Sequence, residues 1–348
     1  MRRRGLISAL VLAAALFVAG CAIEPPLHLK QAMMVIVKVI WKVEVYPEGV
    51  KPSGITMYFF RDGEFYRKQS TSEVDSCAVY LEPGHYQMYM ISQSPYEFAY
   101  MDFLNMDDYD NASVRVRETK SRWYTRADGE VLINNPEEMV VGVSEEFDIT
   151  EEMLSEYPIY NSSNKAEWKG SRTIRIPVYP RSIVSQYWIT AYSENADALK
   201  AVRASTTGFA RDFLLTKDIS GSEGGTQLIT SWSLTIDDPI SRTGHIDGII
   251  TTFGFPDGDT PSPDRDPSLN VSTLLIDDTT VQDYVFKVGN LISGEAPSPG
   301  YRMLYRLILG SVDNPVLHPP DIHPPDDVSG FDATVSDWED GEIIDISM

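Results

Sequence analysis

Apolar and polar residues alternate along short blocks of this chain, which is the pattern of β-strands. The first block runs from Met33 to Val45. From position 37 onward its polar residues, Lys38, Lys42 and Glu44, fall on one parity. Such alternation puts apolar side chains on one face of a strand and polar ones on the other, so the block predicts a half-exposed strand. Few stretches show the 3.6-residue period of a helix, and the sequence therefore predicts an all-β fold.

A hairpin is predicted where an Asp-Gly pair at 62–63 separates two strand-like blocks, 55–60 and 64–67. The pair supplies the positive φ angles that a two-residue hairpin turn requires. Residues 114–117 and 138–143 have the composition of further strands. The first half of the chain therefore contains enough strands for a β-sheet domain.

A second turn lies between two strand-like runs at Leu81, Pro83, Gly84 and Tyr86. Proline sets φ for a turn, and glycine tolerates the conformation that follows it. This Leu-x-Pro-Gly-x-Tyr arrangement is frequent at the corners of Ig-like and transthyretin-like sandwiches. We expect the Tyr86 ring to pack inward while its hydroxyl bonds to a neighbouring backbone group.

Strand-like blocks recur through the second half at the spacing expected of another sandwich. The first of them, Thr173–Pro180, carries prolines and therefore suits an edge strand. Residues 196–202 predict one or two helical turns. The remaining expected strands are Ser185–Tyr192, Phe209–Leu215, Thr226–Ile236, Gly248–Phe255, Leu269–Ile276, Val281–Val288 and Tyr301–Leu309.

A polar stretch at 161–170 is the expected boundary between two tandem β-sandwich domains. A Pro-rich connector, 312–327, precedes a last strand at 342–346. That strand can complete its own sandwich, which we favour, or reach the open sheet edge of a neighbouring subunit. The expected division is a signal peptide (1–20), a lipidated tether (21–30), an N-terminal sandwich (31–160) and a C-terminal sandwich with connector and terminal strand (171–348).

The signal peptide is expected because three arginines precede an apolar run, Leu6–Ala19. About fourteen residues are too few to cross a bilayer comfortably, since about twenty are needed. The run ends in Val-Ala-Gly-Cys, with cleavage expected between Gly20 and Cys21. This resembles a bacterial lipoprotein signal, and the resemblance implies diacylation of Cys21; an ordinary secretory signal is the alternative. Ala22 in place of Asp points to the outer membrane, on either of its faces.

Charge and cysteine content narrow the possible functions. The formal net charge is −22, so the chain lacks the basic surface of a nucleic-acid-binding protein. Its two cysteines provide no disulfide framework once Cys21 is acylated. Cys77 lies in a predicted strand, where a small buried apolar residue is the favoured interpretation and a reactive nucleophile the other.

Three segments that contain acidic or histidine residues are candidate metal sites, and each is better explained without a metal. The carboxylates at Asp257, Asp259, Asp264 and Asp266 suit Ca²⁺, but their loop lacks the spacing and the closing Glu of a calcium loop. The acidic patch at 107–111 also fits a solvated turn. His318 and His323 lie in the Pro-rich connector, where polyproline geometry puts them on different faces. No cofactor is expected.

The sequence contains no nucleophile elbow, phosphate-binding glycine loop or paired-histidine zinc motif, so we expect no enzymatic activity. Trp123, Tyr124 and Trp168 could stack on sugar rings or belong to the core. Stacking on sugar rings would favour a glycan-binding function.

Five features together resemble the fimbrillin-like lipoproteins of Bacteroidetes, whose members include shaft, tip and anchor subunits of pili. They are the signal ending at Cys21, the strand 35–45, the corner at 81–86, the segment 204–210, and the closing 335–341 followed by a terminal strand. The resemblance implies two transthyretin-like sandwiches, no catalysis, and assembly with other fimbrial subunits by strand exchange. The bilayer, through the Cys21 acyl chains, would be the other partner.

One departure from that family bears on the role of the chain. Shaft subunits lose their lipid-bearing N-terminal strand by proteolysis after a basic residue, often Arg. Here no Arg lies between Cys21 and Arg61, and Lys30 is the only Lys or Arg before the first strand. The expected function is a non-enzymatic, uncut fimbrillin-like surface lipoprotein, an adhesive component or anchor of pili. The alternative is a surface glycan-binding lipoprotein of a polysaccharide-uptake system.

Overall fold

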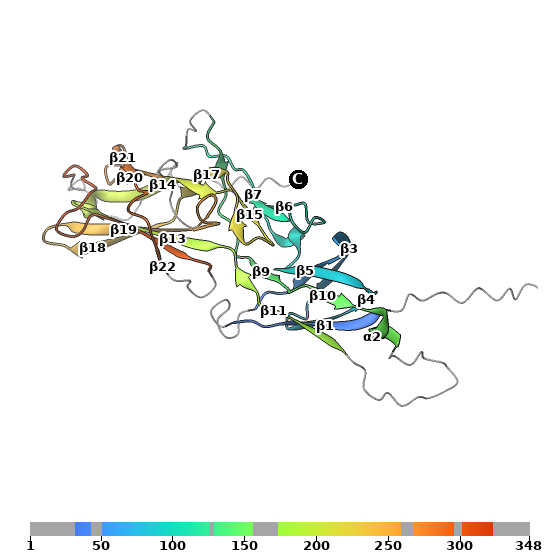
Figure 1. Ribbon diagram of the computed structural model, residues 1–348. Helices are drawn as coiled ribbons and strands as arrows, with labels where there is room; N and C mark the ends of the chain where they lie inside the picture. Colours follow the sequence, from blue (N-terminus) through green and yellow to red (C-terminus); the bar gives the residue numbers. More distant parts are fainter. Residues whose placement is uncertain are drawn as a thin grey trace, which may run out of the picture.

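The computed structural model describes residues 32–42, 51–124, 129–155, 173–258, 267–295 and 301–322. Within them the chain forms five β-sheets, and its helices are short: η1 (Pro95–Glu97), η2 (Ala196–Ala198) and α2 (Glu151–Ser155). The all-β prediction is confirmed (Figure 1). Among the described residues, no helix is long and apolar enough to cross a membrane. The expected signal peptide with Gly20 and Cys21, and the strand expected at 342–346, lie outside the described residues.

The first sandwich consists of two sheets, called sheet A and sheet B. Sheet A has the order β11 (Ile174–Val178), β1 (Met33–Val39), β4 (Ser76–Leu81). Sheet B has the order β12 (Arg181–Ser182), β9 (Val140–Val143), β5 (Gly84–Ser92), β2 (Ile55–Arg61), β3 (Glu64–Thr71), with β10 (Phe147–Ile149) also on β5. Their facing side chains, among them Val35, Val37, Met57, Phe59 and Met88, form one fully buried core.

Sheet B is covered on its other face by a smaller sheet C. Sheet C has the order β16 (Ile219–Ser220), β15 (Asp212–Leu214), β7 (Ser113–Val116), β6 (Met101–Leu104). The core between them contains Tyr58, Phe60, Tyr89, Val114 and Phe213. Because both faces of sheet B are covered, the first six residues of β2 are all buried, and the strand is apolar without alternation.

The second sandwich packs sheet D on sheet E around Tyr187, Phe209, Phe255, Leu269 and Tyr305. Sheet D has the order β21 (Val281–Lys287), β20 (Ser268–Leu275), β14 (Leu199–Ala210), β17 (Gly224–Ile229), β8 (Leu132–Ile133). Sheet E has the order β18 (Trp232–Asp238), β19 (Thr243–Thr252), β13 (Ser185–Ser193), β23 (Leu304–Leu309), β22 (Ser293–Glu295). All but β8 of these strands come from the second half of the chain.

The two sandwiches exchange strands. β8, from the first half of the chain, pairs in parallel with β17 of sheet D. In return β15 pairs with β7 in sheet C, while β11 and β12 join sheets A and B. The expected division grouped residues 174–182 with the second sandwich, whereas their backbone pairing puts them in the first. The proposed boundary residues 161–170 lie outside the described part of the chain.

Several local predictions are confirmed. Asp62 and Gly63 form the hairpin turn with φ angles of 53° and 84°. In β1 the side chains alternate, with Met33, Val35, Val37 and Val39 buried and Lys38 exposed. β11, which contains Pro177, lies at the edge of sheet A.

Several boundaries differ from the prediction. The strand expected from Met33 to Val45 ends at Val39, and the one expected at Phe209–Leu215 is divided between β14 and β15. Two further differences have a common cause. The block 226–236 is divided between β17 in sheet D and β18 in sheet E, because the chain changes sheets at residues 230–231. Of the helical turns expected at 196–202, only η2 forms, and β14 begins at Leu199. In both places pairing with distant strands overrides the local pattern.

Candidate functional site

The corner at 81–86 carries the chain from sheet A to sheet B, since β4 ends at Leu81 and β5 begins at Gly84. Tyr86 is fully buried, and its hydroxyl donates to the Glu82 carbonyl at 2.7 Å. Its ring stacks on Phe147 of β10 with centroids 5.5 Å apart. Burial raises the pKa of Tyr86, so the hydroxyl stays protonated and available as a donor.

The other corner residues lie close to Arg61 at the end of β2. Gly84 has nearly extended backbone, with φ of 159°. A Cβ on Gly84 would lie 2.7 Å from Arg61 Nε. The absence of a side chain therefore leaves room for Arg61, whose Nη1 pairs with Glu82 at 2.8 Å. This ion pair holds Glu82, directly before Pro83, to the end of β2.

His85 lies beside the corner and joins β5 to β10. Its Nδ1 is 2.8 Å from Asp148 Oδ1, and its Nε2 is 3.2 Å from Glu146 Oε2. Gln87 donates to the other Glu146 oxygen at 2.7 Å. The hydrogen bond to Asp148 is the main cause that raises the pKa of His85. When it is protonated, the imidazole forms ion pairs with Asp148 and Glu146, and so holds β10 against β5.

We expect the pairing of β10 with β5 to weaken as the pH rises. A raised folded-state pKa means that the stabilising contribution is complete below the unfolded value, about 6.5, and is lost as the pH rises through the folded value. Amide hydrogen exchange of β10 should therefore speed up, relative to the intrinsic rate, as the pH rises above about 6.5. In His85→Gln this pH-dependent change should disappear, and equal profiles in the two proteins would contradict the role of His85.

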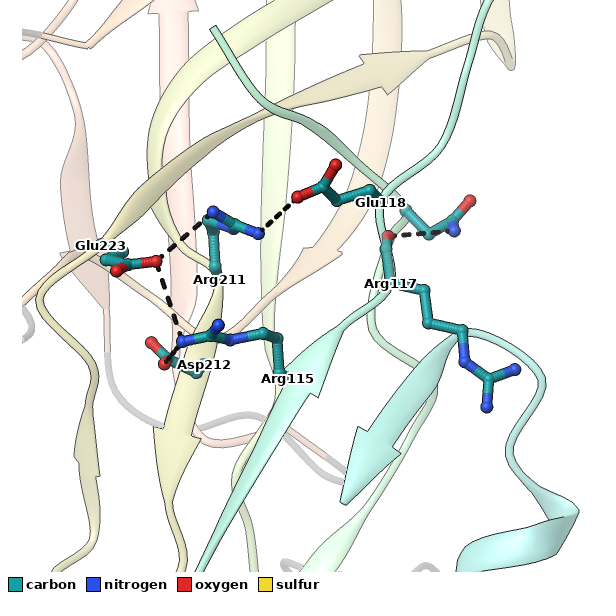
Figure 2. Close-up of polar contacts among 7 residues, drawn as sticks. Arg115, Arg117, Glu118, Arg211, Asp212 and Glu223 are labelled. Carbon is teal, nitrogen blue, oxygen red and sulfur yellow. Dashed lines mark hydrogen bonds and ion pairs between the residues drawn. The ribbon is translucent and has the colours of Figure 1, made fainter. Parts of the chain in front are cut away.

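Charged side chains cluster where the two sandwiches interlock (Figure 2). Arg115 of β7 contacts Asp212 of β15 at 2.8 Å and Glu223 at 3.7 Å. Arg211, with a side chain only 12% exposed, contacts Glu223 at 3.3 Å and Glu118 at 2.9 Å. Sequence reasoning missed this cluster, because Arg115 and Asp212 are 97 positions apart and no local motif joins them. We call these five residues the junction cluster.

A second set of contacts, centred on Asp218, also joins strands from different sheets near Phe213. Asp218, at the turn between β15 and β16, pairs with Arg302 and with Arg181 of β12 at 2.9 Å. The Arg302 guanidinium lies over the Phe213 ring, 5.2 Å from its centroid. The chain therefore ties strands from both halves together, with buried Phe213 at the centre.

Most of the suggested calcium ligands lie outside the described residues, so that site stays a sequence prediction. No cluster of three or more His, Cys, Asp or Glu able to hold a metal is found among the described residues. Asp257 is described, whereas Asp259, Asp264 and Asp266 lie outside the described residues. In the patch at 107–111, the Asp108 carboxylate accepts a hydrogen bond from the Asn111 side-chain amide at 2.7 Å and others from the backbone N–H groups of Asn111 and Asp110. These bonds lower the pKa of Asp108 and stabilise its turn.

The other flagged side chains have structural contacts. Trp123 lies against the Arg203 guanidinium at 4.5 Å, and the Tyr124 hydroxyl donates to Glu130 at 2.7 Å. His318 pairs with Glu194 at 3.0 Å. Cys77 is 8% exposed, and burial raises the pKa of its thiol, as expected of a small buried residue. His323 and Trp168 lie outside the described residues.

No protein-family model and no curated protein sequence matches this chain. Solved structures do match it. A Bacteroides ovatus protein described as "a putative adhesin" superposes with a TM-score of 0.55 at 14% identity, covering 84% of this chain and 94% of the other. A second Bacteroides ovatus protein with the same description gives 0.48 at 8% identity, covering 80% and 89%.

The fimbrial anchor protein Mfa2 from Porphyromonas gingivalis gives a TM-score of 0.43 at 10% identity, covering 75% of this chain and 84% of that one. The structural neighbours are thus Bacteroidetes proteins described as adhesins or fimbrial proteins. The chain has the fold of the first Bacteroides ovatus protein, in agreement with the fimbrillin-like resemblance.

Proposed function

We propose that this chain is a non-enzymatic, fimbrillin-like cell-surface protein that acts as an adhesive component or anchor of fimbriae. The observation that carries the proposal is the shared fold over 84% of the chain with a protein described as an adhesin.

An anchor or accessory role is favoured because β1 is built into the middle of sheet A. It pairs in parallel with β11 and antiparallel with β4. Its inward side chains Met33, Val35, Val37 and Val39 are at most 4% exposed. Loss of this strand would uncover the core between sheets A and B and break two ladders. Together with the absence of Arg between Cys21 and Arg61, this supports a subunit that keeps its N-terminal strand.

Cys21 is the proposed attachment to the outer membrane, and replacing it should release the protein. We expect wild-type cells to incorporate labelled palmitate into the chain and to retain it in the membrane fraction. Cys21→Ser should take up no label and appear in the soluble fraction. The substitution removes the acyl chains, each of whose buried methylenes contributes about 0.8 kcal/mol to membrane binding. Cys77→Ser serves as the matched control and should behave as wild type. A Cys21→Ser protein that still floats with membranes, beside an unlabelled wild type, would contradict the attachment.

A glycan-binding function is the second candidate, and one surface residue favours it. Trp188 is 37% exposed on the outer face of sheet E, next to Gln186 and Arg306. An exposed indole of this kind can stack on a sugar ring.

Two assays on one protein separate these functions. If the fimbrial proposal holds, fimbriae sheared from cells should contain the chain, free or covalently cross-linked to fimbrial subunits. On a glycan array, wild type and Trp188→Ala should then give the same signal. Absence from the fimbrial fraction, together with Trp188-dependent glycan binding, would replace the fimbrial proposal with the second candidate.

A further inference from the structure

The outer face of sheet A differs in charge from the rest of the chain. The chain has 51 Asp and Glu against 29 Lys and Arg. The side chains that alternate away from the core on this face include no Asp or Glu. They are Met34, Ile36 and Lys38 of β1, Ser76, Ala78 and Tyr80 of β4, and Arg175 and Pro177 of β11. We call these eight residues the outer face of sheet A.

The two acidic residues that flank β4 are neutralised. Asp75, directly before the strand, pairs with Lys51 at 2.5 Å. Glu82, directly after it, pairs with Arg61 at 2.8 Å. Arg67 adds a further positive charge at this edge, since its Nη1 donates to the Tyr80 carbonyl at 3.2 Å. The outer face therefore carries net positive charge in an acidic protein.

The face combines these cations with exposed aromatic and apolar side chains. Tyr80 is 60% exposed, and Met34, directly opposite it in the ladder, is partly exposed. Ile36 lies between Ala78 and Arg175. Tyr179, just beyond β11 on the same parity, is 53% exposed. Figure 1 shows β1 and β11 on the side of the first sandwich away from β6 and β7, so sheet C does not cover this face.

We propose that the outer face of sheet A rests on the surface of an anionic lipid bilayer. Tyrosine rings favour the headgroup region, and exposed Lys and Arg are attracted to anionic headgroups. The inference rests on the proposed acylation of Cys21, which lies only twelve positions before β1 begins at Met33. Twelve extended residues reach roughly 40 Å, so an anchored chain can lay this face on the bilayer.

The anchor also explains why a small contact suffices. A tethered face meets the bilayer at high effective concentration, so the weak attraction of two exposed cations and a few apolar side chains is enough to orient the molecule. A bilayer is favoured over a protein partner because the face includes the strand nearest to the proposed anchor and is complementary in charge to anionic headgroups.

The test uses the mature chain with Cys21→Ser, so that binding reports the face alone. It is sedimented with phosphatidylglycerol–phosphatidylcholine vesicles and with pure phosphatidylcholine vesicles. We expect binding to the anionic vesicles to be at least about tenfold stronger, and to fall when salt is raised to about 0.5 M. The double change Lys38→Glu with Arg175→Glu should reduce anionic-vesicle binding by at least about tenfold.

The matched control reverses two exposed lysines elsewhere, Lys217→Glu with Lys287→Glu, and makes the same change in net charge. It should bind within about twofold of the parent, because Lys287 lies on β21 of sheet D and Lys217 in the turn between β15 and β16 of sheet C, and neither belongs to sheet A. Tyr80→Ser tests the aromatic contribution and should weaken binding without any change in charge. Circular dichroism of each variant checks that the fold is retained.

Equal losses in the two charge reversals would show attraction by net charge alone and overturn the proposal. Self-association that Lys38→Glu and Arg175→Glu abolish, with no vesicle binding by the parent, would assign the face to a second copy instead. Since the assay uses unacylated chain, its failure leaves palmitate labelling of Cys21 and fimbrial co-isolation untouched. Failure of the labelling, in turn, would not alter the vesicle result.

Discussion

Replacing Tyr86 by Ala should lower the free energy of unfolding by about 3–5 kcal/mol. The change removes a fully buried ring that stacks on Phe147 and contacts Tyr66, with centroids 5.5 and 5.8 Å away. It also leaves the partly buried Glu82 carbonyl without the hydroxyl that donates to it at 2.7 Å. Both losses fall at the point where the chain passes from sheet A to sheet B.

Equilibrium denaturant unfolding measures this effect. Tyr86→Phe keeps the ring and should cost only about 1 kcal/mol, which isolates the hydroxyl. Tyr80→Ala, on the exposed side of β4, is the matched control and should change stability by less than about 0.5 kcal/mol. A Tyr86→Ala midpoint equal to that of wild type would show that the corner does not hold the sandwich.

Replacing Phe213 by Ala should destabilise both sandwiches together, by about 3–5 kcal/mol. Phe213 is fully buried in the core between sheets B and C, although it comes from the second half of the chain. Its ring lies 6.0 Å from that of Phe253 and beneath the Arg302 guanidinium. Because β15 pairs with β7 and β8 pairs with β17, neither sandwich keeps all its strands when the other unfolds.

Hydrogen exchange with peptide resolution checks this cooperativity. Peptides from β2 and from β19 should lose protection at the same denaturant concentration in wild type, and at the same lower concentration in Phe213→Ala. Val285→Ala, at a side chain 70% exposed on β21, should leave both curves in place. Separate transitions for β2 and β19 would mean that the sandwiches are independent, and would contradict the interlocked junction.

The sequence predicted those features that neighbouring residues determine. The alternation in β1, the Asp62-Gly63 turn and the edge position of β11 all follow from side-chain parity or backbone φ, and the structure agrees. The run Ile55–Phe60 already carried a signal for burial on both faces, since it is apolar without alternation. That signal does not say which sheet covers the second face.

The interlocked strands could not be predicted, because their partners lie far apart in the chain. β8 has two residues and β15 three, too short for a periodic pattern. Their pairing depends on strands roughly a hundred positions away and on the mixed core around Phe213. The junction cluster could not be predicted from the sequence for the same reason, because Arg115 and Asp212 come into contact only when both sandwiches have formed. Acylation of Cys21 and the place of the terminal strand 342–346 stay predictions.

Cross-linking mass spectrometry on intact cells tests the fimbrial proposal most directly. Wild-type chain and Cys21→Ser would be cross-linked at the surface, isolated, and their partners identified. The account predicts that wild type is linked to fimbrial subunits and retained on the cell, and that Cys21→Ser is found in the medium or periplasm with fewer of those links. Links confined to polysaccharide-uptake proteins, unchanged by Cys21→Ser, would contradict both the fimbrial role and the lipid anchor.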